Sequence, residues 1–275
     1  MWRKKITGHG VKSIGSRIAP ASGFSHRAFT TMGYAIMQKE LVVPDLGQLK
    51  RAFTVLPQLT DMDAQTVVHD AYGIIMRGLD LESAGLLQSA LQLEGVHTEV
   101  VDESKLPSFL PAKVVHQIEL GASHLTLYDP MKRVSEVPWG DIMLLAAGLV
   151  RTRGQHKVKE LETIGGTRSK EEVAEHLVIE ILLNGGAARY SVNGDDFIWE
   201  HLGARMTEDR PMNFVRTLAE LALRAPQAGM NRGAFLAAQE PPELFPYHSR
   251  QMFNEELTWM LWRIAKMQGS ANLGA

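Results

Sequence analysis

The sequence contains no cysteine among its 275 residues, which excludes disulfides, thiolate-bound zinc, iron–sulfur clusters and a cysteine nucleophile. Long apolar runs are also missing. The longest, residues 142–150, is well short of the roughly 18–20 residues that a membrane-spanning helix needs. No apolar segment of the secretory type stands near the N-terminus. We therefore expect a soluble, cytoplasmic protein.

Acidic residues are absent before Glu40, whereas seven lysines and arginines precede it. Residues 1–31 are also rich in glycine and serine and show no sustained apolar period, so we expect a disordered basic extension. Three interpretations stay open. The segment is an artefactual extension with Met32 as the true start, a basic arm that contacts nucleic acid or another acidic surface, or a targeting peptide.

The whole chain is 45% hydrophobic and 22% charged, with a formal net charge of −2. This composition supports a sizeable core and argues against a generally basic nucleic-acid binder. At about 150 residues per domain, the length allows one large domain or two ordinary ones. A change of pattern at residues 107–111, which hold two prolines, marks the predicted linker between two domains.

Residues 33–106 carry an alternating strand and helix pattern. In its clearest part, residues 72–102, Asp80 is placed to cap a helix, Gly95 to end it, and the next residues alternate as in a strand. Apolar spacing predicts the other elements: strands at residues 34–43 and 74–76, and helices at 46–56 and after Thr60. The expected order is β-α-α-β-α-β.

This order, with Glu94-Gly95-Val96 before the final strand, resembles the C-terminal domain of the bacterial ribosomal stalk protein. It also resembles the Clp protease adaptor, which shares that fold, and a small bacterial ferredoxin-like domain. The adaptor's acidic pocket follows its first strand, where this sequence has Val43-Pro44-Asp45. We therefore transfer no binding residues, because likeness of fold alone does not assign function.

Residues 112–268 change to a mostly antiparallel strand pattern with helices at the C-terminal end. Strands are expected at residues 114–120, 125–128, 134–137, 142–150, 177–183, 187–192 and 197–199, with a loop at 151–168 and a helix at 212–224. Asn184-Gly185-Gly186 predicts a hairpin. The order of strands and helix, with the turn at residues 137–142, resembles a bacterial pleckstrin-homology-like barrel. That likeness implies binding of peptides, lipids or partner domains, although Lys132 and Arg133 stand alone as cations in their hairpin.

The predicted fold class is therefore α+β, a small β-α-α-β-α-β domain followed by a β-barrel-like domain. Four groups of polar residues are considered as candidate catalytic or metal-binding sites: Glu171-Glu172-Glu175-His176, His97 with Glu99, His116 with His124, and Asp129 with Asp141. A solvated helix start, exposed strand faces and a turn explain them more simply. We assign no catalytic, cofactor-binding or metal-binding residue.

A C-terminal helix is predicted over residues 251–267. Its apolar face is formed by Phe253, Leu257, Met260, Leu261 and Ile264, and a second flank by Trp259, Trp262, Arg263 and Lys266. The second flank is either packed in the core or exposed for a protein partner or a membrane surface. These four residues are our candidate partner-binding residues.

Taken together, the sequence favours a non-enzymatic interaction or adaptor module whose partner is another protein. One alternative is a membrane-surface or lipid-binding regulator that uses the C-terminal helix. A second alternative is an enzyme whose site carries no known motif. Nucleic acid is expected at most at the basic N-terminal arm.

Overall fold

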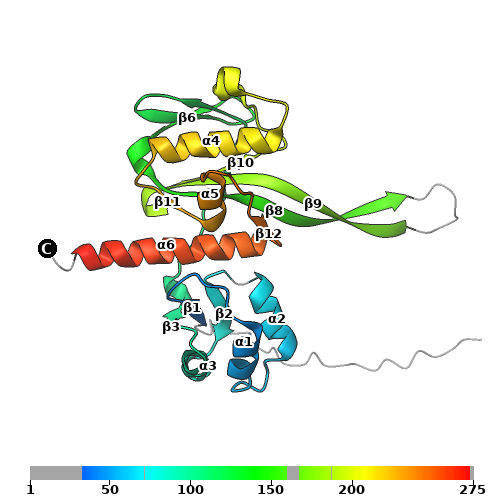
Figure 1. The fold of residues 1–275 in the computed structure, drawn as a ribbon, viewed down its shortest axis with the longest axis vertical. Coiled ribbons are helices and arrows are strands. Elements are labelled where there is room, and N and C mark those ends of the chain that lie inside the picture. Colours follow the sequence, from blue (N-terminus) through cyan, green and yellow to red (C-terminus); the bar gives the residue numbers. More distant parts are fainter. Residues whose placement is uncertain (1–32, 71, 160–166, 187, 273–275) are drawn as a thin grey trace, which may run out of the picture. The chain divides into compact units, whose positions relative to one another are not determined.

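The computed structural model describes residues 33–70, 72–159, 167–186 and 188–272 (Figure 1). Residues Met32–Ala275 form one compact unit. The predicted extension, residues 1–31, lies outside the described residues. Helices and mostly antiparallel sheets both build the described chain, which confirms the α+β class.

The first part is a three-stranded antiparallel sheet with three helices on one face (Figure 1). Its strands are β1 (Tyr34–Gln38), β2 (Ile74–Leu79) and β3 (Thr98–Asp102), in the order β2-β1-β3. The helices are α1 (Leu46–Phe53), α2 (Asp61–Asp70) and α3 (Leu81–Leu93). This is the predicted β-α-α-β-α-β order. Because side chains alternate along a strand, Ile36 packs towards the helices while Ala35 and Met37 pack on the opposite face.

Local signals fix the ends of these elements. The Asp80 side chain accepts a hydrogen bond from the Ser83 backbone N–H at 2.9 Å, as the sequence predicts for a helix cap. Gly95, with φ of +80°, ends the same helix. The prediction that the first strand reaches residue 43 is wrong. The strand ends at Gln38, whose side-chain amide donates to the Val42 carbonyl at 2.5 Å and folds the chain back.

The second part holds two further sheets. One contains β4 (Lys113–Val115), β8 (Ile142–Lys159), β9 (Thr167–Leu183), β10 (Arg189–Asn193), β11 (Gly229–Met230) and β12 (Pro246–Tyr247). The other is the meander β5 (Gln117–Leu120), β6 (His124–Tyr128) and β7 (Val134–Pro138). Helices α4 (Arg210–Arg224) and α5 (Arg232–Ala237) follow. The predicted strands at 125–128 and 134–137, the β9–β10 hairpin and the helix at 212–224 are confirmed.

In the part of the chain that the structure describes, these sheets do not close into a barrel. The predicted strand 114–120 breaks at His116, and its two halves join different sheets. Its first half, β4, pairs with β10, whereas its second half, β5, pairs with β6. The expected strand at 197–199 contributes only an isolated bridge between Ile198 and Gln117. The β-barrel-like description is therefore corrected to separate sheets that share one bent strand.

The expected loop at residues 151–168 is wrong for residues 151–159 and 167–168, whereas residues 160–166 lie outside the described residues. Strand β8 continues to Lys159, and β9 begins at Thr167 and pairs with β8 from that residue onward. The polar composition of this segment suggested a loop. Two long paired strands, however, form backbone hydrogen bonds with each other whatever side chains they carry. The Glu171–His176 group therefore lies on a strand and not at a helix start.

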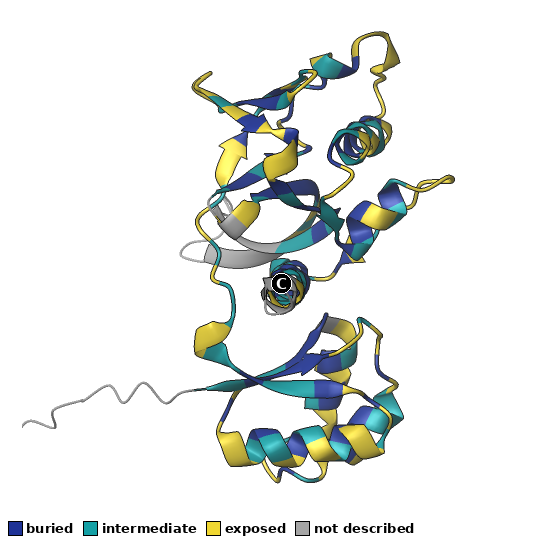
Figure 2. Ribbon diagram, turned by 90° about the vertical axis from the view of Figure 1, so that its left-hand side faces the viewer, coloured by how far each residue is buried: buried dark blue, intermediate teal, exposed yellow. Residues whose placement is uncertain are grey.

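Helix α6 (Arg250–Asn272) lies between the small sheet and the β8–β9 sheet, as both views show (Figures 1 and 2). Phe253, Leu257 and Leu261 pack with residues of β8 and β9. Trp259 and Trp262 pack on the face of the small sheet that α1–α3 leave uncovered. Among the described residues, no helix is long and apolar enough to cross a membrane.

Candidate functional site

The four predicted partner-binding residues on α6 lie against the small sheet of the same chain. Trp259 Nε1 donates to the Gln38 carbonyl at 2.6 Å, and Trp262 Nε1 donates to Glu99 Oε1 at 3.2 Å. Lys266 forms an ion pair with Glu99, and the Arg263 guanidinium lies 5.8 Å from the centre of the Trp259 ring. The pKa of Glu99 is lowered by Lys266 and Trp262, against the opposing effect of its burial. The contact is intramolecular, and the assignment of this flank to a partner stays a prediction.

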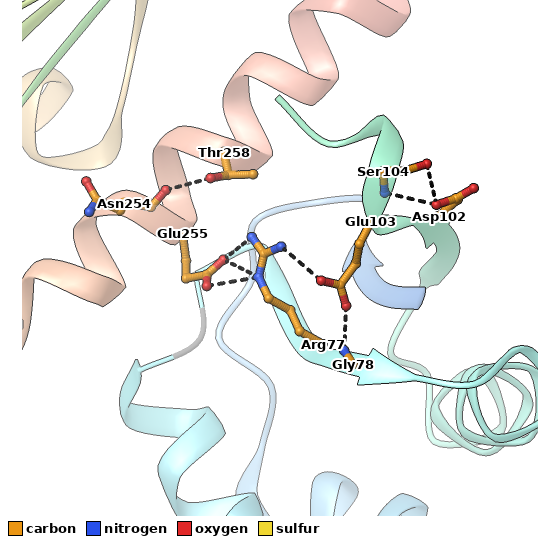
Figure 3. A network of polar contacts seen from close by, with 8 residues as sticks. All are labelled: Arg77, Gly78, Asp102, Glu103, Ser104, Asn254, Glu255 and Thr258. Carbon is orange, nitrogen blue, oxygen red and sulfur yellow. Dashed lines mark hydrogen bonds and ion pairs between the residues drawn. The ribbon is translucent and has the colours of Figure 1, made fainter. Parts of the chain in front are cut away.

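A second polar contact joins α6 to the small sheet (Figure 3). Arg77 of β2 donates from Nη2 to Glu255 Oε2 at 2.7 Å and from Nε to Glu255 Oε1 at 3.0 Å. Glu103 approaches the same guanidinium at 3.9 Å and accepts from the Gly78 backbone N–H at 2.5 Å. Sequence reasoning missed this contact because Arg77 and Glu255 stand 178 positions apart.

Two buried polar clusters hold the second part together. Glu180, fully buried, accepts from Arg189 Nε at 2.8 Å and also pairs with Arg250. Tyr247 donates to the equally buried Glu256 at 2.6 Å, and burial raises the pKa of both groups. Both carboxylates are buried and paired, so the clusters stabilise the packing of α6 and present no free carboxylate to solvent.

The weaker polar groups of the sequence do not assemble into a site. Within the described ranges, no three His, Asp or Glu side chains are placed to hold a metal ion. His176 forms hydrogen bonds with Asp195 at 2.5 Å and with Thr152. Glu99 accepts a hydrogen bond from Trp262 of α6. Asp129 closes a turn, as predicted, by accepting from the Met131 and Arg133 backbone N–H groups.

A groove of about 570 Å³ lies beside β4, and we call it the β4 groove. It is lined by Lys113, Val114, Val115, Leu127, Asp129, Pro130, Met131, Arg133, Ser135 and Tyr190. These residues come from β4, β6, β7, β10 and the turn between β6 and β7. The groove therefore lies where the bent strand passes from one sheet to the other.

One wall of the β4 groove is the free edge of a sheet. Strand β4 is the last strand of its sheet, pairing in parallel with β10, and no described strand pairs with its other side. Large apolar side chains of the groove lining stand exposed beside this edge: Val114 is 55% exposed and Met131 77%. An edge that is both unpaired and apolar is a template for another extended chain.

The charges of the β4 groove are unevenly satisfied. Both Asp129 carboxylate oxygens are used within the turn, Oδ1 by backbone N–H groups and Oδ2 by Arg133 Nε at 2.5 Å. Burial of the Asp129 carboxylate acts to raise its pKa, but these hydrogen bonds hold the pKa below its usual value. Lys113 Nζ lies 5.3 Å from the centre of the Tyr190 ring, and within the described residues it has no carboxylate partner.

No protein-family model matches this chain, and the comparisons with curated proteins and with solved structures gave no match either. The resemblances to the ribosomal stalk and adaptor fold and to the pleckstrin-homology-like barrel therefore stay predictions.

Proposed function

We propose that this chain is a non-catalytic interaction or adaptor module that binds an extended segment of another protein in the β4 groove. The observation that carries the proposal is the unpaired edge of β4 beside an open groove. A peptide laid along this edge would gain main-chain hydrogen bonds, as in other recognition by strand addition.

The groove also offers side-chain contacts for such a segment. Successive residues of a strand point to opposite sides, so every second side chain of the peptide would face the groove. Leu127 and Val115 form its buried apolar floor, and the exposed Met131 stands at its rim. Main-chain bonds would thus supply affinity, and the floor would select apolar side chains.

The membrane-surface alternative finds less support. It relied on the Trp259 and Trp262 flank of α6, and both indole N–H groups have partners on the small sheet. A membrane or an external protein would have to displace these contacts first. The β4 groove needs no such rearrangement, and it therefore carries the proposal.

A random dodecapeptide library displayed on phage tests this function. Peptides selected on the full chain should lose binding when Met131→Trp or Ser135→Trp obstructs the groove. Met62→Trp is the matched control, because Met62 is 72% exposed on α2 and lies outside the groove lining. Failure to enrich any peptide, or enriched peptides that bind all three variants equally, would overturn the proposal.

A further inference from the structure

We propose further that the segment bound in the β4 groove is acidic, with carboxylate side chains that pair with Lys113 and Arg133 and apolar side chains between them. This inference rests on the proposed function and names the chemical class of its partner.

The first support is that the acidic residue of the groove is already neutralised. Asp129 accepts three hydrogen bonds, two from backbone N–H groups of its own turn and one from Arg133. A carboxylate so fully used has little capacity left for a cation brought by a ligand. The field of the groove is therefore set by its cations.

The second support is the unused donor capacity of Arg133. A guanidinium has five N–H donors, and Arg133 gives its Nε to Asp129. Its side chain is 75% exposed, and no contact of its two terminal nitrogens with another described residue is seen. These nitrogens can therefore bind an incoming carboxylate while Asp129 keeps the guanidinium in place.

The third support is Lys113, on the free edge strand itself. Its ammonium lies over the Tyr190 ring at 5.3 Å, a placement that orients the charge without neutralising it. Lys113 is exposed, and Lys132 adds another exposed cation in the adjoining turn. Lysine at a sheet edge opposes pairing with a second uncharged or basic strand. An acidic strand removes that penalty.

The apolar exposure around the groove distinguishes this surface from a general anion site. Val114 and Met131 stand beside the cations, so a free phosphate or a simple polyanion would leave them uncovered. A segment that carries both carboxylate and apolar side chains matches both features of this surface.

Three displayed libraries of dodecapeptides test the inference, with every second position fixed as Glu, Gln or Lys and the other positions random. We expect the Glu library to give the strongest binders to the full chain. For synthetic copies of these binders, Lys113→Gln with Arg133→Gln should weaken affinity at least about fivefold, since two exposed ion pairs are lost. Lys39→Gln, which removes an exposed lysine outside the groove lining, should leave affinity unchanged.

The outcomes separate this inference from the function on which it rests. Equal enrichment of the Gln library, in peptides that Ser135→Trp still blocks, would keep the groove as a peptide site and overturn its acidic preference. Preference for the Lys library would overturn it as well. Absence of groove-dependent binders in all three libraries would instead overturn the proposed function. Circular dichroism of each variant confirms that the fold is retained.

Discussion

Gly73 shows how one residue allows the contact between α6 and the small sheet. It precedes β2 with φ of +81°, and a Cβ atom built on it would lie 2.2 Å from Cγ of Trp259. Both the backbone conformation and the close approach of the indole therefore require glycine. Nothing in the local sequence pattern distinguishes this glycine from one in an ordinary turn.

Gly73→Ala should lower the free energy of unfolding by about 2–4 kcal/mol, because strain at positive φ adds to overpacking against Trp259. Gly78→Ala is the control. Gly78 has φ of +73° but open space where its Cβ would stand, so it should cost only about 1 kcal/mol. Urea unfolding of both variants measures the difference, and equal losses would contradict the close approach seen at Gly73.

At the scale of elements, α6 is a helix with two buried faces. One face packs on β8 and β9, and the tryptophan flank covers the small sheet. The sequence predicted the helix and separated its two faces correctly. It left open what the second flank contacts, because the answer depends on a sheet formed more than 150 positions earlier in the chain.

Trp259→Ala combined with Trp262→Ala should destabilise the protein by about 4 kcal/mol or more, since each change removes a large side chain from the contact with the small sheet. Arg263→Ala should cost less than about 1 kcal/mol, because Arg263 acts through a cation–π contact with Trp259 and a longer-range attraction to Glu99. Thermal or urea unfolding provides the comparison. A double variant as stable as its parent would argue that the flank serves an external partner instead.

Elements that depend on interactions between residues close in the sequence could be predicted, whereas those that depend on distant residues could not. Helices α3 and α4 carry their caps within a few residues, Asp80 and Asp209, and their positions were predicted closely. The distal halves of β8 and β9 are polar and are held by each other, so no local signal marked them as strands. The β4 groove was missed for the same reason, because four strands and a turn contribute to it.

At the scale of the whole molecule, α6 makes the small sheet and the larger sheets depend on one another. The sequence predicted two domains joined by residues 107–111, and that division stays a prediction. In the structure, α6 completes the core of both parts, and the Arg77–Glu255 pair adds a charged contact. Removing one part would therefore expose apolar surface on the other.

We expect the chain to unfold in a single cooperative transition. Its tryptophans report on both parts: Trp259 and Trp262 lie on the small sheet, and Trp139 and Trp199 lie in the core beneath α4. Tryptophan fluorescence and far-ultraviolet circular dichroism should give the same urea midpoint. Two separated transitions would show that the parts are stable independently, as the predicted linker implies.

The position of α6 in the chain has a consequence for synthesis. The small sheet is complete once Asp102 has been made, yet the helix that covers its open face begins only at Arg250. At about 5–20 residues per second, the ribosome needs on the order of ten seconds or more to bridge that gap. During that interval Ala35, Met37, Ile74 and Val101 form an uncovered apolar face on the nascent chain. The newly made protein therefore passes through a stage at which chaperones would find a ready binding surface, and aggregation would be fastest.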